Sequence, residues 1–406
     1  MKRSFLFILV IIILQLSCKE NTITPPDNKP PGWQEDIPWP SLADSPWPMY
    51  RHDAQNTGRS NFSGLNSVNI QWNYDSLYMS NSVVIGYLNE CYVLNGHTIN
   101  STGGLKRFSF SGFEEWSYDI NHISNTSTPI ITKDSAIIFS TFYLGDIVAL
   151  NKNGSLLWRY ETNNYITSNL NIDLQGNIYF VDSTGTLYAI SSNGNYQWSL
   201  QYEQAVFGYG SAFLTFSPDG KVLYVKGSLN LLYAIDITQK QIKWIHPGYF
   251  VASPQMVDSY GNIYLTGEIP PHEISYLKKL NGSGDLEWIY YWGNGQETFY
   301  SSPTIHKNGS IYFGSDTLYA LSFEGKLKWK LPLDNKILSH LVCDANGNIY
   351  VSLGTPLGTK LISVNDRGEM NWTINLEDTN PADAPALANG FIYYPGYRSD
   401  KLYLIK

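Results

Sequence analysis

Eight tryptophans recur along the chain at nearly constant intervals, each inside a short strand-like segment. Successive tryptophans are 40 to 46 residues apart, which is the period of a four-stranded propeller blade and not that of a helical repeat. They are Trp72, Trp116, Trp158, Trp198, Trp244, Trp288, Trp329 and Trp372. This interval predicts a circular array of similar β-sheets.

Each repeat contains two hairpin signals as well as its tryptophan. A glycine turn such as Ser192–Gly194 precedes the tryptophan strand, and an alternating strand such as Leu187–Ile190 precedes that turn. Earlier in the same repeat, a second turn at Gly176 leads into another strand. β-Branched and aromatic residues dominate between the turns, and no stretch after the N-terminal leader has helical periodicity. We therefore expect an all-β chain with four strands in each repeat.

The two ends of the repeat region predict how the array closes. After Trp372 the chain has three more predicted strands, at Ala384–Ala388, Phe391–Tyr394 and Lys401–Ile405, and no ninth tryptophan strand. The strand around Trp72 has no complete repeat before it. Pairing this N-terminal strand with the last three would complete a blade and remove exposed sheet edges. The prediction is an eight-bladed β-propeller of four-stranded antiparallel blades.

The phrase from Trp47 to Ser60 (WPMYRHDAQNTGRS) is followed by repeats of the types Gly-Asn-Ile-Tyr, Leu-Tyr-Ala-Ile and Gly-x-x-x-Trp. On these features, residues 47–406 resemble the pyrroloquinoline-quinone-like (PQQ-like) eight-bladed β-propeller family. That family includes quinone-dependent dehydrogenases and the lipoprotein subunit of the outer-membrane β-barrel assembly machine. The resemblance therefore implies the fold without selecting an activity.

Residues 1–17 resemble a bacterial lipoprotein signal peptide. Lys2 and Arg3 form a basic region, Phe5–Leu14 is an apolar core that is short for a membrane span, and a small-residue cleavage site ends in Cys18. The resemblance implies that Cys18 becomes the lipidated N-terminus of a lipoprotein member of the family. Gln15 departs from the usual pattern, which prefers Leu. An ordinary signal peptide or an uncleaved anchor is the alternative.

Residues 18–46 are rich in proline and predict an extended tether between the lipid and a propeller at 47–406. Lys19 follows the cysteine where some inner-membrane lipoproteins carry Asp, so the resemblance favours the outer membrane, on its periplasmic side or at the cell surface. The formal net charge of −8 disfavours phosphate backbones as partners. We expect a monomer outside any complex, no nucleic acid, and an envelope protein or glycan partner.

Cysteines and histidines give no local metal or cofactor site. Cys91 and Cys343 fall in repeats that are not neighbours, so we predict two buried free thiols. By resemblance, quinone-dependent alcohol dehydrogenases carry two adjacent cysteines against the cofactor, and this chain has no such pair. No zinc-type spacing occurs among the seven histidines, His52, His97, His122, His246, His272, His306 and His340. We expect no metal and no cofactor, with PQQ and calcium bound only if the chain is a dehydrogenase.

Aspartates recur before turn glycines at a similar place in four repeats. The alternating ligand spacing of a calcium loop is absent, so turn formation explains them better than metal binding. The chain also has no nucleophile elbow and no phosphate-binding glycine loop, and we predict no catalytic residue. The four aspartates are Asp173, Asp219, Asp258 and Asp344.

A small residue recurs at the start of each innermost strand and predicts a ring around one mouth of the central channel. In cofactor-binding relatives the ligand lies on the axis, so by resemblance this ring is a candidate ligand site. The alternative, which we favour, is that small residues fit the crowded axis and their hydroxyls bond to nearby backbone groups. The predicted ring comprises Ser82, Thr128, Ser168, Ser211, Ser253, Ser302, Ser339 and Ala384.

Two other segments are candidate binding elements. Arg51 and Asp53 could contact a ligand, but the resemblance implies that Trp47–Ser60 packs against the propeller, and we favour that structural role. An aromatic-rich segment predicts a long loop that could expose an anchor for glycan or protein, although burial over the neighbouring blade is the favoured alternative. Its rings are Tyr290, Tyr291, Trp292, Phe299 and Tyr300.

Together these features predict a lipid-anchored propeller of the cell envelope that acts as a non-catalytic binding or assembly scaffold. One alternative is a PQQ-dependent or related oxidoreductase. A second alternative is a subunit of the outer-membrane β-barrel assembly machine.

Overall fold

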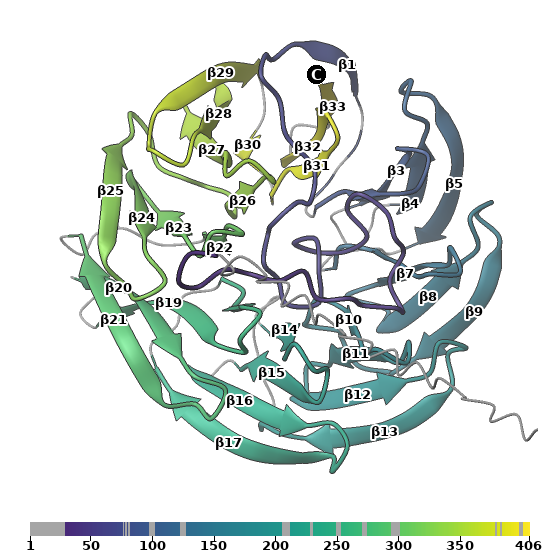
Figure 1. Ribbon diagram of the computed structural model, residues 1–406. Coiled ribbons are helices and arrows are strands. Elements are labelled where there is room, and N and C mark those ends of the chain that lie inside the picture. The colour runs from purple at the N-terminus through teal and green to yellow at the C-terminus, as the bar shows by residue number, and fades with distance from the viewer. Residues whose placement is uncertain are drawn as a thin grey trace, which may run out of the picture.

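The computed structural model describes residues 29–75, 77, 79, 82–96, 102–121, 127–204, 212–227, 230–248, 253–269, 274–293, 301–377, 380–381, 384–397 and 401–406. Within these residues every regular element is a β-strand, and the strands form eight antiparallel sheets arranged in a ring (Figure 1). The predicted eight-bladed β-propeller is confirmed. We number the blades in chain order, so that blade 1 begins at β2 and blade 8 contains the C-terminal strands.

Each of the first seven blades is a four-stranded meander that runs from the axis to the rim. Blades 1 to 3 comprise β2 (Val84–Ile85), β3 (Cys91–Asn95), β4 (Thr102–Phe108) and β5 (Glu114–Asn121); β6 (Ile130–Ile131), β7 (Ile137–Ser140), β8 (Asp146–Leu150) and β9 (Leu156–Glu161); β10 (Asn171–Ile172), β11 (Ile178–Val181), β12 (Thr186–Ile190) and β13 (Tyr196–Gln201).

Blades 4 to 7 comprise β14 (Phe213–Phe216), β15 (Val222–Lys226), β16 (Leu231–Asp236) and β17 (Gln241–Pro247); β18 (Met256–Val257), β19 (Ile263–Ile269), β20 (Ile274–Leu280) and β21 (Leu286–Trp292); β22 (Thr304–Ile305), β23 (Ile311–Gly314), β24 (Thr317–Leu321) and β25 (Leu327–Pro332); β26 (Val342–Cys343), β27 (Ile349–Thr355), β28 (Gly358–Val364) and β29 (Met370–Glu377).

Blade 8 is assembled from both ends of the chain. It contains β31 (Ala386–Ala388), β32 (Phe391–Tyr397) and β33 (Leu402–Ile405), and its outermost strand is β1 (Ile70–Tyr74). Trp72 of β1 pairs with Leu404 of β33, so the predicted closure is confirmed. One strand was not predicted: the short β30 (Asn380–Pro381) also pairs with β32. Closure leaves no open edge between the first and last blades, which is the physical reason to split one blade between the termini.

The recurrent tryptophans join each blade to the next at the rim. The indole N–H of Trp158, for example, donates to the carbonyl oxygen of Ser192 in the turn of the following blade at 2.9 Å. The same bond to the equivalent turn is made by Trp72, Trp116, Trp244, Trp288 and Trp329, at 2.8 to 3.2 Å. At the closing blade, Trp372 donates to Leu65 O at 3.0 Å. The repeated tryptophan is therefore an interblade contact that recurs around the ring.

The turn glycines are required by the same contact. A Cβ atom on Gly194 would lie 2.6 Å from the ring of Trp158, and the residue has φ +76°, so only glycine fits without strain. Trp198 is the exception among the tryptophans. The turn that follows it has Lys240, at φ 57°, in place of glycine, and the Trp198 indole N–H forms no hydrogen bond with the described residues.

Candidate functional site

The residues before β1 form a strap across the axis of the ring, which we call the axial segment (Trp47–Ser63). In Figure 1 this purple stretch lies over the middle of the propeller. Its carbonyl oxygens accept hydrogen bonds from successive blades in order around the ring, so every blade contacts it. The bonds run to Trp47 from Ile85 N, Pro48 from Ile131 N, Ala54 from Asn171 Nδ2 and Phe216 N, Gln55 from Val257 N, Thr57 from Thr304 Oγ1, Gly58 from Cys343 N, and Ser63 from Gly390 N.

Polar side chains hold the axial segment in its path. Arg51 is 1% exposed and donates to three carbonyl oxygens, those of Asn56 at 3.0 Å, Leu341 at 3.3 Å and Pro303 at 2.6 Å. Asn56 Nδ2 donates to the innermost strand of blade 4 and to Gln255 O of blade 5. Arg51 and Asn56 both have positive φ, which a tight reversal of the chain at the axis requires. These contacts fix the axial segment against the propeller, which is the structural role expected for it.

Asp53 fixes the turn inside the axial segment. Its carboxylate accepts hydrogen bonds from the backbone of Gln55 and Thr57 and from the Thr57 hydroxyl. Burial acts to raise the pKa of Asp53, but hydrogen bonds and charge from His52 and the bonds from Thr57 outweigh it, so the pKa lies below its ordinary value. Asp53 is therefore engaged within its own segment.

Part of the predicted tether also packs on the propeller. Gln34 N donates to Lys307 O of blade 6, and Ala43 N donates to Ile131 O of blade 2. Trp39 is 9% exposed and its indole N–H donates to Ile172 O of blade 3 at 2.8 Å. The described part of the predicted 18–46 tether thus lies against the blades, with Trp39 buried there. Residues 18–28 lie outside the described residues.

The predicted ring of small residues falls into two layers. Ser168, Ser253 and Ser339 each lie three residues before a two-residue innermost strand, and each bonds to the residue 13 positions later. In blades 2 and 6 the equivalent residues are Ser127 and Ser301, one residue before those predicted. Ser82, Thr128 and Ser302 occupy the next position along the strand, Ala384 is buried in blade 8, and Ser211 lies outside the described residues.

The position of proline explains why the predicted ring mixes residues from two successive positions of the strand. Ser253 directly precedes a proline, whereas one residue separates Ser127 and Ser301 from the following proline, so aligning the prolines shifts two blades by one position. All described ring residues are buried, and most of their hydroxyls have backbone or hydroxyl partners. The exceptions are Ser82 Oγ and Thr128 Oγ1, which are buried without a hydrogen-bond partner in the described structure.

A group of rings and cations lies at the axis beside the axial segment. The Tyr50 ring stacks on Phe213, with centroids 6.4 Å apart, and meets the His340 ring edge-on at 6.2 Å. Lys226 Nζ donates to Ser253 O at 2.8 Å and lies 5.3 Å from the Phe213 centroid. Burial lowers the pKa of Lys226 to about 7. Burial, with the nearby charges of Arg51 and Lys226, also holds the pKa of His340 well below its ordinary value.

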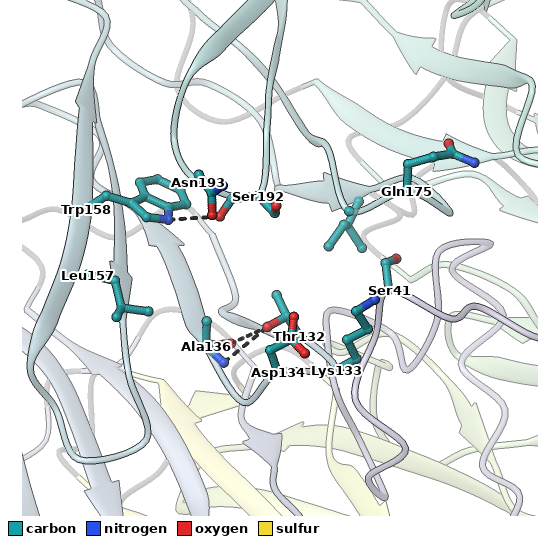
Figure 2. Close-up of a pocket in the computed structure, with 12 residues that line it drawn as sticks. Ser41, Thr132, Lys133, Asp134, Ala136, Leu157, Trp158, Gln175, Ser192 and Asn193 are labelled. Atoms are coloured by element: carbon teal, nitrogen blue, oxygen red, sulfur yellow. Dashed lines mark hydrogen bonds between the residues drawn. The ribbon is translucent and has the colours of Figure 1, made fainter.

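A pocket with a volume of about 490 Å³, which we call the interblade pocket, opens among the described residues. It lies between blades 2 and 3. The turns that follow the innermost strands β6 and β10 form its inner side, β9 and the turn before β13 form its rim side, and Ser41 of the N-terminal segment also lines it. Figure 2 shows Leu157 and Trp158 on one side of the opening and Ser41 and Lys133 on the other. Its lining residues are Ser41, Thr132, Lys133, Asp134, Ala136, Leu157, Trp158, Ile172, Gln175, Gly176, Ser192 and Asn193.

Sequence reasoning did not find this pocket. Trp158 and the Ser192–Gly194 turn look like the equivalent residues of every other repeat. What distinguishes the interface is Ser41, which comes from outside the repeats and donates through Oγ to Asp173 O at 2.5 Å. No sequence signal could reveal that crossing, because the contact joins residues 132 positions apart.

The predicted aromatic loop is partly a strand. Tyr290, Tyr291 and Trp292 form the end of β21, and Trp292 is buried against Phe313 with centroids 4.7 Å apart. Tyr291 is 51% exposed. These three rings continue the tryptophan strand, because Tyr290 and Trp292 pack on Phe313 of the neighbouring blade. The expectation that they lie in a loop was therefore wrong. Phe299 and Tyr300 lie outside the described residues.

The turn aspartates act as expected, with one correction. Asp173 accepts bonds from Gln175 N, Asn177 N, Asn177 Nδ2 and Tyr179 OH. Asp258 and Asp344 make the same four kinds of bond. In blade 4, Ser217 takes this place and donates to Asp219, which lies two residues further on. These carboxylates are therefore used within their turns.

The two predicted free thiols are confirmed. Cys91 and Cys343 are both fully buried and form no disulfide. Burial raises the pKa of Cys343 to about 12 and raises that of Cys91 further still. Among the described residues, no group of three or more His, Cys, Asp and Glu side chains is placed to hold a metal ion. His97, His122, His272, Cys18 and the predicted signal peptide lie outside the described residues. Within the described chain, no helix is long and apolar enough to span a membrane.

The architecture and the repeats together define an eight-bladed propeller whose axis is crossed by the axial segment. Residues 91–253 match the PQQ_2 family, described as outer membrane protein assembly factor BamB. That match and the ring of eight blades make the chain similar to the PQQ-like β-propeller proteins.

One curated relative is an enzyme. A lambda-carrageenase of Pseudoalteromonas carrageenovora is 22% identical over 229 residues, which are 52% of this chain and 24% of that protein. The chain thus spans about a quarter of the length of this relative.

Several solved structures share the fold. BamB from Moraxella catarrhalis superposes with a TM-score of 0.60 at 13% identity, covering 84% of this chain and 98% of that one. A europium-containing methanol dehydrogenase superposes with a TM-score of 0.66 at 11% identity, covering 89% and 98%. The quinohemoprotein alcohol dehydrogenase from Comamonas testosteroni gives 0.63 at 12% identity, covering 88% and 80%. At these identities the likeness shows the fold alone.

Proposed function

We propose that this protein is a lipid-anchored propeller of the bacterial outer membrane that binds other proteins as a non-catalytic scaffold. The observation that carries the proposal is the axial segment. Its backbone contacts all eight blades around the axis, and its buried side chains each bond to two adjacent blades, Asn56 to blades 4 and 5 and Arg51 to blades 6 and 7. Because the chain itself occupies this end of the axis, the surfaces left for ligands are mainly the faces and the rim.

A strapped ring is well suited to presenting loops to partners. A rigid surface loses little conformational entropy on binding, so more of the contact energy appears as affinity. The BamB likeness supports a role in a protein complex, since the matched family is described as an assembly factor. A lipid at Cys18, with residues 19–28 as the remaining tether, would raise the local concentration of the propeller near membrane partners.

Exposed rings on the rim are the first positions to test for a partner. Tyr291 is 51% exposed and Tyr196 is 54% exposed, each on an outermost strand, and an exposed aromatic residue is a frequent anchor in protein interfaces. We expect a photo-crosslinking residue at either position, introduced in intact cells, to capture an envelope protein. The buried position Tyr312 in β23 is the matched control. The absence of adducts from exposed positions on every blade would contradict the scaffold.

The lipid anchor needs a separate test. Cys18→Ala should abolish acylation, and the mass of the mature chain and its membrane fractionation report that change. An unchanged mass and location in the variant would contradict the anchor while leaving the scaffold proposal standing.

The alternative function is a quinone-dependent oxidoreductase, because dehydrogenases are among the solved structures that share this fold. The residues described do not fit the cofactor: the adjacent cysteine pair is absent, and the axial segment fills the axis at one end with its own backbone. Purified protein should therefore show no bound-cofactor spectrum after incubation with PQQ and calcium. Uptake of the quinone would overturn the non-catalytic reading. Copurification with the barrel-forming subunit after mild solubilisation would instead identify the scaffold as part of the β-barrel assembly machine.

A further inference from the structure

We infer that the interblade pocket binds a neutral polyhydroxylated ligand the size of one or two sugar rings. This inference does not depend on the proposed scaffold function. The pocket volume of about 490 Å³ lies within the range of roughly 300–1,000 Å³ that is typical of small-molecule sites. The walls come from turns and one strand that are fixed by backbone hydrogen bonds, so the shape is preformed.

One wall of the pocket is apolar and exposed. Leu157 is 52% exposed beside the half-buried ring of Trp158. The polar end of that ring is already engaged, because the Trp158 indole N–H donates to Ser192 O. A ligand on this wall therefore meets carbon surface, which matches the C–H face of a sugar ring and gains from removal of apolar area from water.

The other walls offer neutral polar groups and two groups of opposite charge. The side-chain polar atoms of Asn193, Ser192, Lys133 and Asp134 form no hydrogen bond or ion pair with other described residues, and all four residues are exposed. An amide both donates and accepts, as a serine hydroxyl does, while Lys133 only donates and Asp134 only accepts. Vicinal sugar hydroxyls also donate and accept, so this set can satisfy them from several directions.

Other ligand classes fit these walls less well. A phosphate or sulfate would meet a single cation, Lys133, whose sequence neighbour Asp134 has the opposite charge. A wholly apolar ligand would cover polar groups without giving them partners, which costs about 1–3 kcal/mol for each buried group. The mixture of one apolar wall with uncharged polar groups and two opposite charges therefore favours a neutral polyol.

The test uses the full-length chain in detergent with maltose, cellobiose and lactose as probes. We expect at least one of them to bind with a Kd on the order of 1 mM or lower, measured by ligand-observed NMR and calorimetry. Ser192 is exposed at the pocket wall, so Ser192→Trp should fill the space without disturbing the core and weaken binding at least ~10-fold.

Matched variants separate a specific site from general destabilisation. Asn193→Ala should weaken binding roughly 5-fold, the equivalent of one hydrogen bond. Asn153 precedes the turn glycine of blade 2 as Asn193 precedes that of blade 3, so Asn153→Ala should leave binding unchanged. The inference is overturned if none of the three disaccharides binds at concentrations of about 20 mM, well above the expected Kd. It is also overturned if binding survives Ser192→Trp, or if a short peptide and no saccharide occupies the pocket.

Discussion

The rim and the axis of the ring are held together by different kinds of contact. At the rim, the same bond recurs from blade to blade: a tryptophan N–H donates to a turn carbonyl, and a glycine lies against the ring face. At the axis, one non-repeating segment bonds to all eight blades, and Ala54 bonds to two of them, blades 3 and 4. Each rim contact joins only two neighbouring blades, whereas the axial segment contacts all eight; within it, Arg51 bonds to carbonyl groups of blades 6 and 7 and of its own segment.

This difference shows how a repeat protein can gain cooperativity. Nearest-neighbour contacts give a stability that is approximately a sum over interfaces. A segment that contacts every blade ties the units together, so loss of one axial contact affects several interfaces. The rim should therefore respond locally to substitution, and the axis should respond more strongly.

The largest effect should come from breaking the axis at Arg51. Arg51→Met removes hydrogen bonds to three buried carbonyl groups, and we expect the free energy of unfolding to fall by about 4 kcal/mol. Urea titration followed by tryptophan fluorescence measures the loss. Arg367→Met is the control, because that side chain is 75% exposed and should change stability by less than ~0.5 kcal/mol. Equal effects in the two variants would refute the special role of the axis.

The rim should show smaller effects that repeat from blade to blade. Trp288→Ala and Trp329→Ala remove the same half-buried ring and the same indole bond, so each should cost about 3 kcal/mol. The two losses should agree within about 1 kcal/mol if the contacts are local. As a check on the hydrogen bond itself, Trp329→Phe should cost about 1 kcal/mol more than Trp198→Phe, since Trp198 lacks the turn bond. Widely different losses at Trp288 and Trp329 would show that the rim is not a simple repeat.

The axis also predicts a dependence of stability on pH. Because the folded pKa of Lys226 is lowered to about 7, the unfolded chain binds more protons than the folded one above that pH. Stability from this group should rise by about 2 to 3 kcal/mol between pH 7 and pH 9, and it should be flat below pH 6. Lys226→Met should be more stable than the parent chain at pH 6, and that advantage should shrink by about 2 to 3 kcal/mol by pH 9. Parallel urea titrations at the two pH values measure this, and a constant difference would contradict it.

The smallest effect separates backbone strain from ring contact at the rim. Gly194→Ala should cost about 1 to 2 kcal/mol more than Gly390→Ala in thermal or urea unfolding. Both glycines have positive φ, but an added Cβ meets Trp158 at 2.6 Å in the first case and nothing within 4 Å in the second. A similar cost for both would mean that the ring moves freely to admit the methyl group.

The rim and the blade count could be predicted from the sequence because they repeat. Trp72 and Trp372 carry the same pattern as the six tryptophans between them, and the period alone gives the number of strands. The pairing of the N-terminal strand with the last blade was predicted by counting the strands at the two ends of the chain. The small residues of the channel were found by the same logic, but prolines shifted their alignment by one position in blades 2 and 6.

The axial contacts and the interblade pocket could not be predicted in this way. Arg51 and Ser41 lie outside the repeats, and their partners are up to 290 residues away along the chain. Neither residue belongs to a repeating pattern from which its contact could be predicted. The aromatic run at Tyr290 was misplaced as a loop for a related reason, since packing on the adjacent blade extends its strand.

The sequence by itself determined a closed ring of eight blades, because a regular spacing of tryptophans and turn glycines can be satisfied only when each unit packs on the next. Only the tertiary structure decided what fills the axis and where a pocket opens. Those features arise where a unique segment crosses the repeats, and its path depends on hydrogen bonds between residues that are distant in the chain.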